Sequence, residues 1–169
     1  KNSNTYVLGE IIHNETVCNK LTKSGITTVN NINEIPFDVQ NCNVIVRTHG
    51  EPLETFNILA NKECKVLDCT CPFVKDIQNI VNKHYNEGYT IAIIGNAKHP
   101  EVIGINGWCD NKGIVVQNVE QLNAINAEKL CVVVQTTFSE EKFEEIIKNF
   151  NSNNVKIVDI FKTICYTTT

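Results

Sequence analysis

The sequence contains no methionine and a single arginine, Arg47. It also lacks any apolar run near the ~18 residues of a membrane-spanning helix, so we expect no membrane partner. Acidic residues outnumber basic ones, 19 to 15, and the net charge of −4 argues against general nucleic-acid binding. No Gly-x-Gly-x-x-Gly or phosphate-loop motif occurs, so nothing supports nucleotide binding.

The 169 residues have an ordinary globular composition, enough for one domain or two small ones. Their unusual feature is eight cysteines without a Cys-x-x-Cys pair, which disfavours a zinc finger or a thioredoxin-like site. Cysteines inside apolar runs, such as Cys131, are expected to be small buried packing residues. Cys71 and Cys165 differ, because each follows a strand-like run, where α/β proteins build their sites.

Short β-branched strands alternate with longer helical patterns, which predicts an α/β fold with parallel sheets. The strands are expected at 5–8, 26–29, 43–47, 65–68, 90–94, 114–117, 130–135 and 155–159. The helices are expected at 15–23, 52–61, 74–86, 101–106 and 140–149. Ser139 is a predicted N-cap, and Gly25 and Gly88 are predicted to end helices.

The chain also resembles itself at an offset of about 90 residues, which predicts two copies of one α/β unit. The matched segments are 25–29 with 113–117, 31–35 with 118–122, 44–49 with 132–137 and, at an offset of 91, 65–68 with 156–159. We assign 1–72 to the first unit and 73–165 to the second. The helix at 74–86 has no counterpart in the first unit, so that unit's leading helix is expected upstream of Lys1.

Polar residues recur where equivalent strands end. If both strand-end rims face one cleft, that cleft holds the following residues: His13, His49, His99, Thr136, Cys71 and Cys165. Three kinds of chemistry stay open there: a zinc site with Cys and His ligands, an iron–sulfur cluster held by Cys, or a thiol nucleophile with a His base. Two cysteines cannot hold a [4Fe–4S] cluster alone, so a third ligand would come from outside the chain.

Each of the three histidines precedes a turn-forming residue and a helical segment, an arrangement suited to an anion such as phosphate. Glu101, directly after His99 and Pro100, is either a first-turn helix acid or a proton donor beside that anion. His84 lies among polar residues in a helical run and receives no functional role.

At these residues the chain resembles the 4-hydroxy-3-methylbut-2-enyl diphosphate reductase family of the methylerythritol phosphate route to isoprenoids. The similarity runs from Tyr6 to Thr168 and rests on six ordered motifs: Glu-Ile-Ile-His-Asn (10–14), Arg-Thr-His-Gly (47–50), Asp-Cys-Thr-Cys-Pro (68–72), His-Pro-Glu-Val (99–102), Gln-Thr-Thr (135–137) and Ile-Cys-Tyr (164–166). It covers only the middle of the family's length.

The resemblance implies a trefoil of three α/β units around a central [4Fe–4S] cluster, with 166–169 starting the link to a third unit. Cys71 and Cys165 match two of the three cluster cysteines, and the third belongs to a loop upstream of Lys1. Glu101 matches the proton donor. The matched substrate residues are His13, His49, His99, Thr136 and Thr168.

The implied reaction is reductive dehydroxylation to isopentenyl and dimethylallyl diphosphate, with a ferredoxin- or flavodoxin-type electron donor. It implies a cytoplasmic location in bacteria and a plastid-type organelle in eukaryotes. We expect residues 1–169 alone to be inactive. The alternatives are a non-catalytic module that kept the fold and a mononuclear zinc hydrolase.

Overall fold

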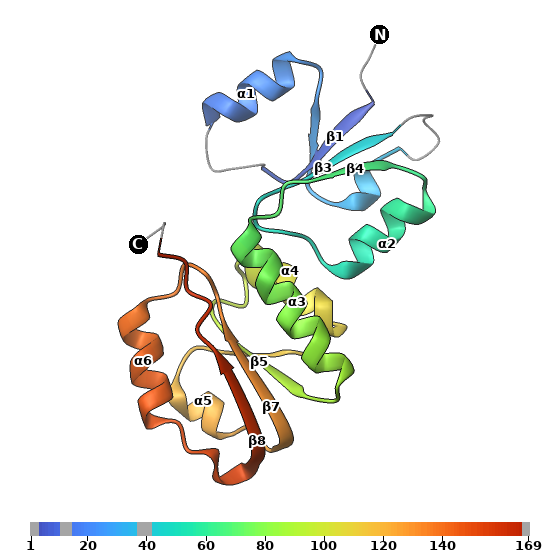
Figure 1. Cartoon of the computed structure of the whole chain (residues 1–169). Helices are drawn as coiled ribbons and strands as arrows, with labels where there is room; N and C mark the ends of the chain where they lie inside the picture. The colour runs from blue at the N-terminus through green and yellow to red at the C-terminus, as the bar shows by residue number, and fades with distance from the viewer. Residues whose placement is uncertain (1–3, 11–14, 37–41, 167–169) are drawn as a thin grey trace. The chain divides into compact units, whose positions relative to one another are not determined.

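The computed structural model describes residues 4–10, 15–36 and 42–166, and it divides the chain into two compact units, Lys1–Cys71 and Pro72–Thr169 (Figure 1). The first unit runs β1 (Thr5–Leu8), α1 (Glu15–Lys23), β2 (Thr27–Val29), η1 (Ile32–Glu34), β3 (Asn43–Val46), α2 (Leu53–Asn61) and β4 (Lys65–Asp68). The second runs α3 (Pro72–Asn86), β5 (Thr90–Ile94), α4 (Pro100–Asn106), η2 (Gly107–Cys109), β6 (Ile114–Val116), α5 (Val119–Asn123), β7 (Ala127–Val134), α6 (Glu140–Asn149), η3 (Ser152–Asn154) and β8 (Val155–Phe161).

Each unit contains one four-stranded parallel sheet, in the order β2-β1-β3-β4 and β6-β5-β7-β8. The α/β fold predicted from the sequence is therefore confirmed. The central strands of the second sheet, β5 and β7, are apolar and buried from Ile91 to Ile94 and from Leu130 to Val134. Strands covered on both faces need such continuous apolar runs.

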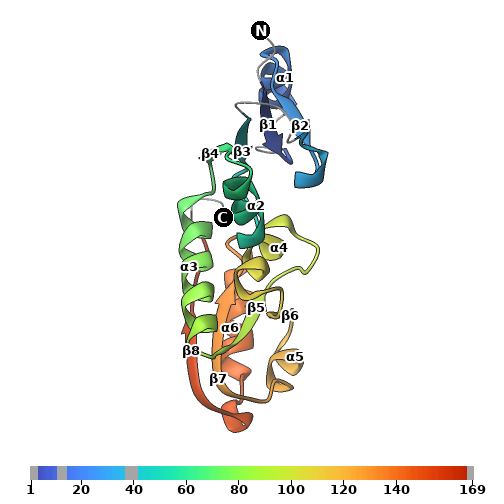
Figure 2. The ribbon, with the colours of Figure 1, turned by 90° about the vertical axis from the view of Figure 1, so that its right-hand side faces the viewer.

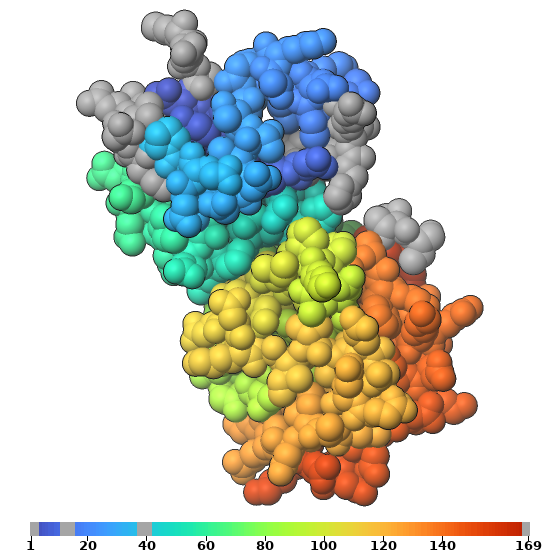
Figure 3. All heavy atoms as spheres, turned by 180° about the vertical axis from the view of Figure 1, so that it is seen from behind, coloured from blue at the N-terminus to red at the C-terminus, as the bar shows by residue number. Residues whose placement is uncertain are grey.

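Helices cover both faces of the second sheet. Ile77 and Val81 of α3 pack with α4 on one face, whereas Phe143 and Ile146 of α6 pack with α5 on the other. α3 runs beside the edge strand β8 (Figure 2), whose Phe161 packs against the apolar cluster that contains Ile77 and Val81. In the space-filling view, residues 100–125, coloured yellow to orange, form a continuous part of this unit's surface (Figure 3).

The two sheets have the same register, which supports the predicted repeat. Tyr6 pairs with Val44 in the first sheet, and Ala92 pairs with Val132 in the second. The match predicted for 25–29 with 113–117 is wrong by one residue, because Tyr6 pairs with Thr27 where Ala92 pairs with Ile114. The alignment predicted for the last strand is wrong by three residues. Val44 pairs with Val66 and Val132 pairs with Ile160, so the offset there is 94 rather than 91.

The cause of that error is the greater length of β8, which has seven residues where β4 has four. The Lys-Ile-Val-Asp sequence at 156–159, which resembles 65–68, lies in the part of β8 that extends toward its N-terminal end. The corrected offset of 94 also separates Cys71 from Cys165, so these two cysteines are structural equivalents.

Candidate functional site

The strongest cluster of candidate residues lies in the second unit, just past the carboxyl ends of β5, β7 and β8. Glu101 is in the first turn of α4, Thr136 follows β7, and Cys165 follows β8. The three are joined by hydrogen bonds through Thr136, although they are far apart in the sequence. In a parallel sheet, the carboxyl ends of neighbouring strands share one edge, and that geometry brings these residues together.

The carboxylate of Glu101 is almost completely buried, with 2% of the residue exposed. Thr136 donates from its amide nitrogen to Oε1 at 2.6 Å and from its hydroxyl to Oε2 at 2.6 Å. A buried carboxylate requires such partners, because an unpaired one loses its hydration without compensation. The two bonds therefore fix the position of the acid at this edge of the sheet.

His99 is the N-cap of α4, and its Nδ1 accepts a hydrogen bond from the amide nitrogen of Glu101 at 3.2 Å. An accepting Nδ1 carries no hydrogen, so the hydrogen of the neutral ring lies on Nε2. Nε2 is then the ring atom that can donate to a phosphate-like oxygen. The same contact holds the imidazole against the main chain of Glu101 at the start of α4.

Both candidate cysteines make an equivalent main-chain hydrogen bond to the threonine that lies just past the neighbouring strand. The amide of Cys165 donates to the carbonyl of Thr136 at 2.8 Å, and the amide of Cys71 donates to that of Thr48 at 2.9 Å. Thr48 and Thr136 are equivalent in the repeat. The two units therefore present one cysteine each in the same local geometry, and neither cysteine is in a disulfide.

Sequence reasoning gave no role to the residue that follows β3 or β7, yet both units use it in the same way. Gln135 packs against Gly95 and accepts from the amide of Asn96 at 3.1 Å, and Arg47 packs against Gly9 in the first unit. The match of 44–49 with 132–137 had aligned Arg47 with Gln135 but assigned neither residue a role. Gln135 connects the loop leading to His99 with the loop that carries Thr136.

Arg47 also forms an ion pair, with its Nε 2.9 Å from Oε1 of Glu51. Burial raises the pKa of the Glu51 carboxyl, and the nearby guanidinium only partly offsets that increase. His49 lies between these two residues in the chain, directly after the equivalent of Thr136. A cavity of about 360 Å³ lies beside the corresponding loops of the second unit, lined by Gly95, Asn96, Gln117, Gln135, Thr137, Phe138, Ser139 and Lys142.

Two predicted site residues, His13 and Thr168, lie outside the described residues. Of the others, the structure brings His99, Glu101, Thr136 and Cys165 together in the second unit and places Cys71 beside Thr48 in the first. Within residues 4–10, 15–36 and 42–166, no group of three His, Cys, Asp or Glu side chains could hold a metal ion. The convergence of both rims on one cleft stays a prediction.

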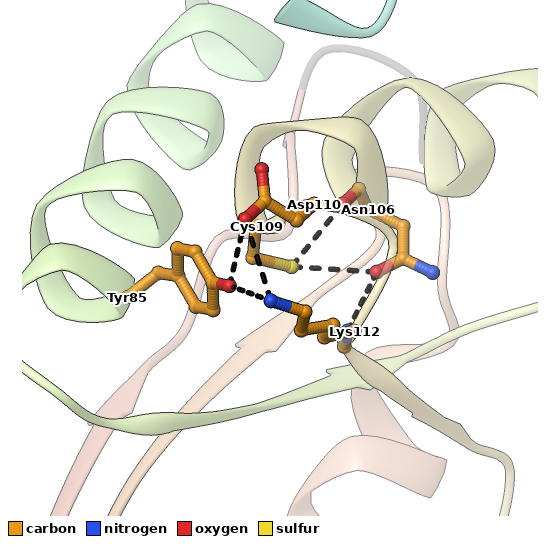
Figure 4. A network of polar contacts seen from close by, with 6 residues as sticks. Tyr85, Asn106, Cys109, Asp110 and Lys112 are labelled. Carbon is orange, nitrogen blue, oxygen red and sulfur yellow. Dashed lines mark hydrogen bonds and ion pairs between the residues drawn. The ribbon is translucent and has the colours of Figure 1, made fainter.

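Buried cysteines elsewhere serve packing, as expected. Cys131 of β7 is fully buried, and burial raises its pKa to about 12. Cys109 donates to the main-chain carbonyl of Asn106 at 3.2 Å, inside a network that includes Tyr85 and Lys112 (Figure 4). The described helices include none long and apolar enough to cross a bilayer.

Comparison with known proteins gives one consistent result. The family model described as LytB protein matches residues 1–169. The 4-hydroxy-3-methylbut-2-enyl diphosphate reductase of Clostridioides difficile (strain 630) is 40% identical over 169 residues, covering 98% of this chain and 59% of that protein. The protein of the same name from Thermoanaerobacter sp. (strain X514) is 42% identical over 161 residues, covering 95% of this chain and 55% of its own length.

Solved structures agree with these relatives. The E-1-hydroxy-2-methyl-but-2-enyl-4-diphosphate reductase from Plasmodium falciparum matches with a TM-score of 0.85 at 29% identity, over 99% of this chain and 53% of that one. A second structure, described as (E)-4-hydroxy-3-methyl-but-2-enyl diphosphate reductase, the terminal enzyme of the non-mevalonate pathway, matches with a TM-score of 0.78 at 38% identity. The match covers 96% of this chain and 58% of the chain in that structure. The chain thus spans between half and three fifths of the length of each of these four proteins.

Proposed function

Because the chain belongs to the LytB protein family, we propose that it is the part of a reductase that removes the allylic hydroxyl of 4-hydroxy-3-methylbut-2-enyl diphosphate. The products would be isopentenyl and dimethylallyl diphosphate. The observation that carries the proposal is the buried Glu101 carboxylate, which Thr136 holds in the same hydrogen-bonded network as Cys165. The resemblance inferred from six sequence motifs is confirmed at the level of the family.

The reaction needs two electrons and two protons, and it replaces the hydroxyl by hydrogen with release of water. Glu101 would supply a proton near the reacting carbons, where its position is fixed before substrate arrives. His99, with its hydrogen on Nε2, would donate to the diphosphate together with His49 and His13. Thr136, and Thr168 beyond the described residues, would lie beside the substrate.

The proposed cofactor is a [4Fe–4S] cluster, and the residues present fit part of it. Cys71 and Cys165 are cysteines outside any disulfide, in equivalent positions at two strand ends, and thiolates are the usual ligands of such clusters. A further cysteine from outside the chain would complete the set. When bound, the cluster would supply the electrons and polarise the C–O bond, drawing on a ferredoxin- or flavodoxin-type donor.

The test uses the complete protein, reconstituted anaerobically with iron and sulfide and supplied with substrate and a chemical reductant. Cys71→Ser and Cys165→Ser should each lose the cluster absorbance, whereas Cys69→Ser, two residues from Cys71, should keep it. Glu101→Gln should keep the absorbance and lower turnover by about 10²- to 10⁴-fold. Stoichiometric zinc without iron uptake, or full turnover by Glu101→Gln, would contradict the proposal.

By the same reasoning, residues 1–169 alone should neither assemble the cluster nor turn over substrate. Product formation by the purified 169-residue chain would overturn that expectation. The proposed location is the cytoplasm for a bacterial source and a plastid-type organelle for a eukaryotic one.

A further inference from the structure

Two cysteines that the proposed reaction does not use lie side by side in the first unit. Cys42 directly precedes β3 and Cys64 directly precedes β4, and the next residues, Asn43 and Lys65, are register partners in the parallel ladder. The amide of Lys65 donates to the carbonyl of Cys42 at 2.9 Å, so the two main chains are already paired at this point. Burial, followed by the neighbouring Cys64 thiol, raises the pKa of the Cys42 thiol to about 12.

This placement is compatible with the main-chain spacing that a disulfide requires. In-register residues on neighbouring strands point to the same face, with strands about 4.7–4.9 Å apart. Disulfides join residues whose Cα atoms are about 4.4–6.8 Å apart, so this pair needs no large movement of the main chain. We propose that Cys42 and Cys64 are a redox-active pair that a low-molecular-weight disulfide such as oxidised glutathione converts into a disulfide.

The two thiols have different surroundings, which sets the order of the steps. Cys42 is 4% exposed, whereas Cys64 is partly exposed at the edge of the same apolar cluster. The Cys64 thiolate attacks one sulfur of oxidised glutathione, the glutathione S–S bond breaks, and one glutathione thiolate leaves. Cys42 then loses its proton to solvent and attacks the Cys64 sulfur, which releases the second glutathione.

The bond would close a ring that contains β3, α2 and the Thr48–His49 turn between them. Oxidation would therefore constrain the crossover that carries one of the candidate substrate histidines. The pairing itself depends only on the neighbouring strands β3 and β4, and it would stand even if the proposed reaction were wrong.

The sequence makes the test unambiguous. Trypsin cuts after Lys23, Arg47, Lys62 and Lys65, so Cys42 and Cys64 are the only cysteines in the peptides 24–47 and 63–65. The complete protein, equilibrated with an excess of oxidised glutathione, blocked with an alkylating reagent and digested, should yield these two peptides joined, and dithiothreitol should separate them.

Cys64→Ser should abolish the joined peptide and lose the oxidation of Cys42, whereas Cys69→Ser should leave both unchanged. A glutathione adduct on Cys64 that never resolves to the joined peptide would overturn the proposal. So would a bond from Cys42 or Cys64 to any other cysteine, or two thiols that stay fully alkylatable throughout.

Discussion

The carboxylate of Glu101 accepts two hydrogen bonds from Thr136, one from the main-chain amide and one from the side-chain hydroxyl. The acid and the threonine are 35 residues apart in the chain, one in the first turn of α4 and the other just past β7. Each bond engages a different carboxylate oxygen. The position of the acid thus depends on the threonine as well as on its own helix.

Thr136→Val tests this pairing, because it removes the hydroxyl while keeping the shape of the side chain. Oε2 of Glu101 would lose its bond in a buried site, which should lower the free energy of unfolding by about 1–3 kcal/mol. Thr136→Ser keeps the hydroxyl and should cost less than ~1 kcal/mol. Urea denaturation measures both, and equal stability of the two variants would show that the hydroxyl bond contributes nothing.

Gly95→Ala tests the packing of Gln135 against the loop after β5. An added Cβ would lie 2.9 Å from Oε1 of Gln135 and 3.0 Å from Cγ2 of Val102, closer than ordinary contacts. Overpacking of this kind costs about 1–3 kcal/mol. The double variant with Gln135→Ala should be destabilised by less than the sum of the single variants, and strict additivity would refute the coupling.

His84 has a structural role that its sequence context did not indicate. Its Nδ1 donates to the carbonyl of Ile80 at 2.7 Å, and its ring packs edge-on against Tyr89 and Phe161 at 5.0 and 5.1 Å. His84→Ala should therefore lower the free energy of unfolding by roughly 2–4 kcal/mol. His84→Phe keeps the ring contacts and should cost less; a larger loss for Phe than for Ala would contradict this account.

Glu140 and Lys162 should make stability depend on pH. Their side chains lie 2.5 Å apart, and the hydrogen bond from Lys162 lowers the pKa of Glu140 from its ordinary value of 4.5. A lowered carboxyl pKa gives stability that is present above pH 4.5 and is lost as the pH falls through the lowered value. Lys162→Met should return the Glu140 pKa toward 4.5, as measured by NMR titration.

The stabilisation from this pair is also lost at high pH. Glu140, followed by Glu144, raises the pKa of Lys162 above its ordinary value of 10.5. Stability from a raised lysine pKa is complete below 10.5 and is lost as the pH rises through the raised value. Glu140→Gln should reduce the loss of unfolding free energy at both low and high pH. An unchanged loss at low pH in this variant would exclude the pair as the cause of the acid dependence.

Periodicity and turn chemistry predicted the elements well. Ser139 caps α6 through its side chain, and Gly25 and Gly88 adopt the positive φ that helix-ending glycines favour. The short α5 was missed, because five residues carry too little periodicity to register. The 91-residue offset failed for a related reason, since similar letters in a longer strand do not fix the ladder register.

The sequence was enough to identify residues of the candidate site, but not the hydrogen bonds between them. His99 and Glu101 are neighbours in the sequence, so their shared helix start could be anticipated. The bonds from Thr136 to Glu101, and from the Cys165 amide to Thr136, depend on which strands are adjacent. Strand order is a tertiary property that no local pattern contains.

The matching cysteine-to-threonine bonds of the two units also bear on how such a site could arise. In each unit the bond lies just past the last strand of the sheet, at the equivalent register position. Duplication of a gene segment would therefore place a cysteine at the same strand end in each copy. Thiols at these ends would then increase by one with every copy of the segment. A set of strand-end thiols built by duplication in this way needs one ancestral cysteine rather than several independent substitutions.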